Sequence, residues 1–276
     1  MSIASTFVET PFGKFHVEST GQGKPVFFIH GGTASAREWR PVLEKLGKHA
    51  RCIAMDRLGC GESDRSLQGY DRATLTKSLL ALADALGFDR FGVVGQSFGG
   101  FWSLSLAFAA PERISRMVLV NSAGGPLTED QIAARRQRQA EIRRTQTAED
   151  ASDAAREAAV ERTIKMIFAD PSKIPPTYRD DLRWQMERAD AGQMGAVGEE
   201  FERMGKERYD VLKVPTLVVW GDADSMIPLA NAHQLVAAIP GARYGGIPGV
   251  GHTCQIEAPD VFVALVGPFL DETAGA

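Results

Sequence analysis

One stretch decides the fold of this chain: Phe91-Gly92-Val93-Val94-Gly95-Gln96-Ser97-Phe98-Gly99-Gly100. Its apolar first half predicts a buried strand, and the apolar segment 101–110 that follows predicts a helix. A strand that runs straight into a helix must turn sharply, and this turn falls at Ser97. The turn strains the backbone and leaves room only for small neighbours, which Gly95 and Gly99 provide. The stretch therefore predicts a nucleophilic serine at the tip of the turn.

Short apolar runs bounded by turn residues recur along the chain. They do not alternate polar with apolar residues, which is typical of strands buried on both faces of a parallel sheet. Helical patterns lie between them, such as the leucine stripe from Leu75 to Leu86. This alternation predicts an α/β fold, with a mostly parallel twisted sheet and helices on both faces. The runs are Pro25–His30, Cys52–Asp56, Phe91–Gly95, Met117–Val120 and Thr216–Trp220.

The alternation breaks in segment 127–209, which is charged, rich in Arg, Glu and Ala, and has no strand-like run. We expect it to form a helical lid, interrupted at Pro171 and Pro175, with 1–126 and 210–276 forming the core. Its aromatic side chains are candidates either to line a pocket or to pack the lid on the core. They are Phe168, Tyr178, Trp184 and Phe201.

Composition narrows the class of protein. A chain of 276 residues, 44% hydrophobic and 24% charged, fits an ordinary globular protein with one large core. The net charge of −4 argues against a nucleic-acid partner. No run approaches the roughly 18 apolar residues of a membrane span, and no signal peptide is visible. Cys52, Cys60 and Cys254 have no metal-like spacing, so we expect reduced thiols in a cytoplasmic protein without a metal. The oligomeric state is left open.

A serine needs a base within hydrogen-bond reach, and the base needs a carboxylate that fixes its tautomer. His252 is the candidate base, because it lies in a glycine-rich loop that can bend back over the sheet. Asp222 and Asp224 follow the last long apolar run and are both candidate acids. The residues alone leave the choice open, since Asp222 can also cap the following turn.

The segment His30-Gly31-Gly32-Thr33 follows the apolar run that begins at Pro25. Backbone N–H groups in such a loop can bind the oxyanion that forms during acyl transfer. We expect the donors to be the N–H groups of Gly32 and of Phe98, the residue after the nucleophile. We expect His30 to hold this loop in place by hydrogen bonds.

These features together resemble the α/β-hydrolase superfamily over the whole chain except the lid. In that family the acid stands three residues after the strand-end glycine, so the resemblance selects Asp224 and implies a Ser97–His252–Asp224 triad without metal or organic cofactor. The usual Arg-Gly-His-Gly is here Arg57-Leu58-Gly59-Cys60-Gly61, a departure within a motif that is structural in the family. The segments that carry the resemblance are Phe28–Gly32, Met55–Ser63, Gly95–Gly100, Trp220–Pro228 and Gly251–Pro259.

The resemblance also narrows the reaction. A serine at position 97 argues against haloalkane dehalogenases and epoxide hydrolases, whose nucleophile is Asp. The loop His-Gly-Gly-Thr-Ala lacks the His-Gly-x-Gly-Pro-Gly usual in ring-cleavage C–C hydrolases, and Gly95–Gly99 departs from the Gly-Gly-Ser-Trp-Gly of proline iminopeptidases. We therefore expect an enzyme that hydrolyses a small or medium-sized carboxylic ester or lactone through an acyl-enzyme. The alternatives are a C–C bond hydrolase of ring-fission products and a non-hydrolytic ligand receptor or cofactor-free peroxidase on the same fold.

Overall fold

The computed structural model describes residues 2–32, 34–65, 70–133, 137, 153–188 and 198–272. An eight-stranded sheet with the order β1-β2-β4-β3-β5-β6-β7-β8 runs through its centre. The pairs from β4 to β8 are parallel, and β1 and β2 are antiparallel at one edge. The predicted fold class is thereby confirmed. The strands are β1 (Ala4–Thr10), β2 (Gly13–Thr20), β3 (Pro25–Ile29), β4 (Arg51–Met55), β5 (Phe91–Gln96), β6 (Ile114–Val120), β7 (Thr216–Gly221) and β8 (Arg243–Ile247).

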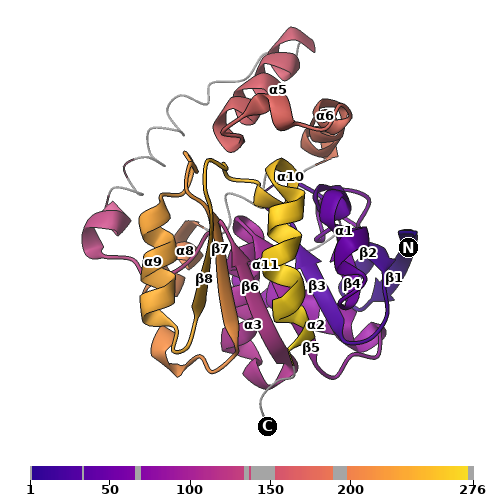
Figure 1. Cartoon of the computed structure of the whole chain (residues 1–276). Helices are drawn as coiled ribbons and strands as arrows, with labels where there is room; N and C mark the ends of the chain where they lie inside the picture. Colours follow the sequence, from indigo (N-terminus) through magenta and orange to yellow (C-terminus); the bar gives the residue numbers. More distant parts are fainter. Residues whose placement is uncertain are drawn as a thin grey trace.

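Helices connect the strands and cover the sheet (Figure 1). Four short 3-10 turns are η1 (Ala36–Trp39), η2 (Pro111–Arg113), η3 (Pro171–Lys173) and η4 (Tyr209–Val211). The described α-helices are α1 (Arg40–Leu46), α2 (Arg72–Ala85), α3 (Phe98–Ala109), α5 (Asp153–Ile167), α6 (Tyr178–Arg188), α8 (Gly198–Gly205), α9 (Leu229–Ala238), α10 (Cys254–Glu257) and α11 (Pro259–Asp271).

The sheet separates two apolar layers. Helices α2, α3 and α9 pack on one face, where Leu79, Phe101 and Leu235 are buried. Helices α1 and α11 pack on the other face, where Leu43 and Phe262 are buried. Because both faces are covered, the central strands consist of the continuous apolar runs seen in the sequence.

Local sequence signals set the ends of helices, as α2 shows. The Asp71 side chain accepts a hydrogen bond from the N–H of Thr74 at the start of the helix. At its other end Gly87 has a φ of 72°, a left-handed conformation that glycine adopts without steric cost. The leucine stripe, including Leu75 and Leu82, is buried against the core.

Helices α5 and α6 lie outside the sheet layers and stack over one end of the molecule (Figure 1). The 3-10 turn η3 separates them at Pro171, and their apolar side chains form a cluster of their own. We call residues 153–188 the α5–α6 unit. Its Ile167 carbonyl accepts the N–H of His252, in the loop after β8, so the unit lies at the carboxyl ends of the strands. Residues 134–136, 138–152 and 189–197 of the expected lid lie outside the described residues.

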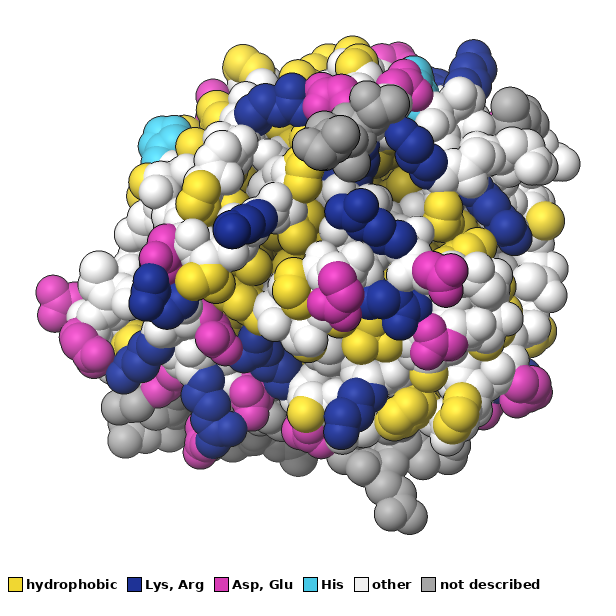
Figure 2. Space-filling model, turned by 90° about the horizontal axis from the view of Figure 1, so that it is seen from below, with side chains coloured by type: hydrophobic (Ala, Val, Ile, Leu, Met, Phe, Trp, Pro, Cys, Tyr) yellow, Lys and Arg dark blue, Asp and Glu magenta, His cyan; other side chains and the backbone are white. Residues whose placement is uncertain are grey.

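The opposite face of the molecule carries acidic and basic side chains interspersed with hydrophobic ones (Figure 2). Within the described ranges, no helix is long and apolar enough to cross a membrane. The same ranges contain no group of three or more His, Cys, Asp or Glu side chains placed to hold a metal ion. Cys52, Cys60 and Cys254 are all buried.

Candidate active site

Ser97 lies at the sharp turn between β5 and α3. Its φ of 49° and ψ of −117° place a non-glycine residue in a strained region of backbone space. A Cβ on Gly95 would lie 2.3 Å from the carbonyl oxygen of Gly99, and one on Gly99 would lie 1.9 Å from that of Ile29. The two glycines are therefore required by close backbone approach, as the turn predicted. The backbone N–H of Ser97 donates to the carbonyl of Val120 at 2.9 Å, which holds the turn against β6.

His252 and Asp224 form a buried pair. His252 Nδ1 lies 2.8 Å from Asp224 Oδ2, and the two side chains are 4% and 0% exposed. A ring nitrogen that donates to a carboxylate carries the proton, so Nε2 is left as the acceptor. This is the tautomer that a general base requires.

Three further donors hold the carboxylate of Asp224. Its Oδ1 accepts the N–H groups of Met226 at 2.7 Å and Ile227 at 3.1 Å, and its Oδ2 accepts Nδ2 of Asn121 at 2.7 Å. Burial by itself raises the pKa of Asp224, but the bond from His252, the charge of its ring and the donors from Asn121 and Ile227 hold that pKa below the usual carboxyl value. Asp224 is therefore held as an anion beside the histidine.

Asp222 lies elsewhere in the same loop. It is exposed, and its Oδ1 accepts the N–H of Gly249 at 2.7 Å, at the start of the loop that carries His252. The two candidate acids, between which the sequence motifs alone did not decide, thus have different surroundings. Asp224 faces the histidine, and Asp222 fastens the histidine loop from outside.

The loop after β3 lies against Ser97. A Cβ on Gly31 would lie 3.3 Å from Cβ of Ser97 and 2.2 Å from Oε1 of Gln96. Gln96 also donates from Nε2 to the carbonyl of His252 at 2.9 Å. Gln96 therefore bridges the β3 loop and the histidine loop directly beneath the serine.

Buried side chains fix the orientation of this loop. His30 Nδ1 donates to the carbonyl of Gly31 at 2.7 Å, and its Nε2 accepts the N–H of Arg57 at 3.1 Å. Burial, and then the charge of Arg57, lowers the pKa of His30 to about 3, so it is neutral. The guanidinium of Arg57 donates to the carbonyls of both Gly31 and Gly32. In a trans peptide the C=O and N–H groups point in opposite directions, so fixing the Gly31 carbonyl also fixes the Gly32 N–H.

The side chain of Glu38 also holds this loop, through the backbone N–H of Gly31. Its Oε1 accepts the N–H of Gly31 at 3.0 Å. Burial raises the pKa of Glu38 to about 8, against the opposing effects of the Gly31 hydrogen bond and the Arg57 charge. The N–H of Gly31 is thus engaged by Glu38 and is not free to bind a substrate.

The aromatic residues of the expected lid have three different surroundings. Phe168 and Tyr178 pack on each other inside the α5–α6 unit, with ring centroids 5.1 Å apart. The Trp184 ring lies under the guanidinium of Arg37, 3.7 Å from its centroid. Phe201 of α8 packs on Phe101 at 4.5 Å, beside the start of α3.

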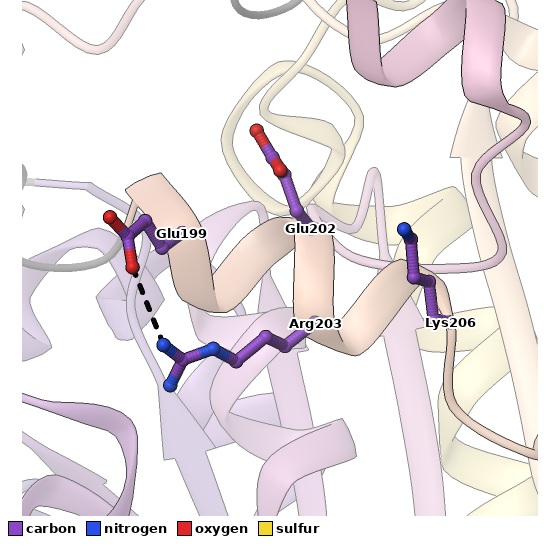
Figure 3. A pocket seen from close by; sticks show the side chains of 4 residues that line it. All are labelled: Glu199, Glu202, Arg203 and Lys206. Carbon is purple, nitrogen blue, oxygen red and sulfur yellow. Dashed lines mark hydrogen bonds and ion pairs between the residues drawn. The ribbon is translucent and has the colours of Figure 1, made fainter.

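A surface hollow of about 390 Å³ lies over the other side of α8 (Figure 3). Four charged side chains line it, three from α8 and one from the turn directly after it: Glu199, Glu202, Arg203 and Lys206. Glu199 and Arg203 form an ion pair at 3.3 Å. The candidate catalytic residues Ser97, Asp224 and His252 lie elsewhere, on the segments that follow β5, β7 and β8, and none of them lines this hollow.

Several contributors to the site were not predicted from the sequence. Asn121, which orients Asp224, follows β6 directly and has a φ of 40°. A polar residue at the carboxyl end of a central strand is a detectable signal, since ligands bind there in open α/β sheets. The contacts of Arg57 and Gln96 have no comparable signal, because each depends on how separate loops meet.

Fold and site define the class of protein. Residues 24–259 match the family described as the alpha/beta hydrolase fold, and the chain belongs to that family. The 2-hydroxymuconate semialdehyde hydrolase of Pseudomonas sp. (strain CF600) is 32% identical over 278 residues, covering 95% of this chain and 92% of that protein.

Two solved structures are also similar. One is a serine hydrolase from the polyaromatic hydrocarbon-degrading bacterium Cycloclasticus zankles, with a TM-score of 0.79, 23% identity and 98% of each chain covered. The other is Est816, described as an N-acyl homoserine lactone degrading enzyme, with a TM-score of 0.75, 25% identity, and 96% of this chain and 100% of that chain covered.

Proposed function

We propose that this protein is a serine hydrolase that cleaves a small or medium-sized carboxylic ester or lactone through an acyl-enzyme. One observation carries the proposal: the buried hydrogen bond of 2.8 Å between His252 and Asp224, next to a strained serine turn. Ser97 is the nucleophile, His252 the base, and Asp224 the acid that orients the base. Each step uses only these groups, backbone N–H donors and water.

The reaction begins when Ser97 Oγ attacks the carbonyl carbon and His252 Nε2 takes its proton. The carbonyl oxygen becomes an oxyanion, bound by the N–H groups of Gly32 and Phe98. His252 then gives the proton to the leaving alkoxide, and the acyl-enzyme remains. Water, deprotonated by His252, then attacks the acyl carbon. The bond from that carbon to Ser97 Oγ breaks, His252 returns the proton to Ser97, and the acid is released.

The oxyanion loop is preorganised for this role. Its carbonyls and its Gly31 N–H are already bonded to His30, Arg57 and Glu38. Reorganising backbone dipoles during the reaction is costly, so donors fixed in advance stabilise the transition state more strongly. The ring of Phe98 is 2% exposed and packs against Trp102 at 5.3 Å, which keeps its N–H at the start of α3 in place.

A second candidate function is C–C bond hydrolysis of a ring-fission product. It is favoured by the 32% identity to a 2-hydroxymuconate semialdehyde hydrolase over nearly the whole chain. The same nucleophile, base and oxyanion donors serve that reaction, but the leaving group is a carbon that must be protonated. The loop sequence Gly31-Gly32, without the Pro-Gly that is usual in such enzymes, favours the ester or lactone.

A substrate panel tests these functions against one another. Wild type and Ser97→Ala are assayed on nitrophenyl esters of increasing acyl length, on acyl lactones, and on a coloured dienoate. The proposal expects ester or lactone turnover that Ser97→Ala abolishes. Turnover of the dienoate alone would establish the second candidate, and a folded protein that hydrolyses nothing would favour a receptor or peroxidase role.

A further inference from the structure

A group of hydrogen bonds joins the α5–α6 unit to the loop that carries His252. The N–H of His252 itself donates to the carbonyl of Ile167, the last residue of α5, at 2.7 Å. The carboxylate of Glu257 accepts the N–H of Gly251 at 2.9 Å, and also those of Ala169 at 3.2 Å and Asp170 at 2.9 Å. One side chain thus binds the residue before the histidine and two residues that lie shortly after the end of α5.

The contact at this junction is close. A Cβ on Gly251 would lie 2.6 Å from both the N of Ala169 and the carbonyl oxygen of Ile167. Glu257 is 5% exposed, and its neighbour Ile256 belongs to the apolar cluster of the α5–α6 unit. The histidine loop and the end of α5 therefore cannot shift independently.

The acid loop is tied to the same place. The hydroxyl of Ser225 donates to the carbonyl of Met166 at 2.8 Å, and Met226 packs against the apolar cluster of the unit. Ser225 and Met226 directly follow Asp224. Segment 166–170 thus bonds both loops that carry the His252–Asp224 pair.

We infer that Glu257 is a positioning residue: by holding the end of α5 against Gly251, it sets the orientation of His252 toward Ser97. The inference rests on the proposed function, because it takes His252 to be the base. The α5–α6 unit is accordingly more than a cover over the substrate. Its contact with the histidine loop through Glu257, rather than its attachment to the core as a whole, aligns the base for proton transfer.

The unit has a second attachment to the core that does not involve the loops that carry His252 and Asp224. Arg37 donates to Asp181 of α6 at 2.9 Å and stacks on Trp184 of the same helix. The side chain of Arg37 is 24% exposed. Loss of this attachment loosens the unit without touching Gly251 or His252, which makes Arg37→Ala a matched control.

The experiment compares Glu257→Gln with Arg37→Ala on p-nitrophenyl acetate, well below the melting temperature of each variant. The amide keeps one acceptor oxygen but replaces the other with a donor, which opposes the N–H groups that Glu257 now binds. A displacement near 1 Å can cost about 10²-fold in rate. We expect kcat of Glu257→Gln to fall by about that factor with KM nearly unchanged, and kcat of Arg37→Ala to stay within about twofold. If Glu257→Gln does not fold, Glu257→Asp, which shortens the reach by one methylene, takes its place.

A second readout needs no turnover. The proton that His252 Nδ1 shares with Asp224 gives a downfield NMR resonance, which should move in Glu257→Gln and stay in place in Arg37→Ala. Unchanged kcat and resonance in Glu257→Gln, with a lower melting temperature only, would make Glu257 a structural residue. Equal losses in both variants would assign the effect to a loose α5–α6 unit. If wild type hydrolyses no ester, the proposed function fails, and the resonance alone decides the inference.

Discussion

Replacing Asp224 by Asn changes the tautomer of His252. Both carboxylate oxygens accept hydrogen bonds: Oδ1 from Met226 and Ile227, Oδ2 from Asn121 and His252. An Asn side chain has only one acceptor oxygen. With that oxygen kept on the two backbone donors, its NH₂ group faces His252 and requires Nδ1 to accept. The proton then moves to Nε2, which can no longer take the proton of Ser97.

The expected size of this effect is large. The analogous change in a serine protease lowers kcat by about 10⁴, equivalent to about 5.5 kcal/mol of transition-state stabilisation. We expect a loss of that order for Asp224→Asn on a nitrophenyl ester, with the fold intact by circular dichroism. The matched control is Asp222→Asn, whose amide oxygen can still accept the N–H of Gly249, so kcat should change by less than about tenfold.

Initial rates on one ester, measured with equal amounts of folded protein, are sufficient for the comparison. Since the two variants make the same chemical change two residues apart, a general effect of lost charge cancels between them. The reasoning is refuted if Asp222→Asn is the more damaging change, or if Asp224→Asn keeps a tenth of wild-type kcat.

Three further outcomes are expected. Asn121→Ala removes one hydrogen-bond donor to the Asp224 anion. Because a hydrogen bond to a charged group is worth about 1.5–3 kcal/mol, kcat should fall about 10- to 100-fold. An unchanged kcat would show that Asn121 does not orient the acid. The pKa of Glu38 is raised to about 8 in the folded state, so the stability that its protonated form provides is complete below pH ~4 and is lost as the pH rises toward 8. The unfolding free energy of Glu38→Gln, measured in urea melts, should therefore rise relative to that of wild type by up to about 4 kcal/mol between pH ~5 and ~8. If the two proteins lose or gain stability with pH in parallel, Glu38 is not buried as an uncharged carboxyl. Trp184→Ala removes a ring held between Arg37 and Arg188, and it should alter the preference among long acyl esters more than turnover of the acetate; an unaltered preference would make α6 a packing element.

The fold could be predicted from the sequence because its signals are local. The central strands contain continuous apolar runs, and Gly95 and Gly99 mark the turn at Ser97 because only glycine fits there. At the edge of the sheet β1 and β2 form a hairpin that closes between Thr10 and Gly13, which pair in the register of the two strands.

The site could be predicted only in part. Chain order and a family spacing were enough to name Asp224 and His252, whose catalytic roles stay predictions. The supporting contacts join distant segments: Asn121 and Asp224 are 103 residues apart, and Glu257 and Ala169 are 88 apart. No periodicity or motif specifies such pairs, because they exist only after the loops at the carboxyl ends of the strands have met. The lid boundaries at 127 and 209 also stay predictions.

The central claim is that Ser97 is the nucleophile, and one measurement tests it most directly. The protein is incubated with a fluorophosphonate, which forms a covalent bond only with an activated serine, and is then digested and mapped by mass spectrometry. The account predicts one modified residue, Ser97, with complete and parallel loss of ester hydrolysis. Labelling of a different serine, or hydrolysis that survives in Ser97→Ala, would contradict it.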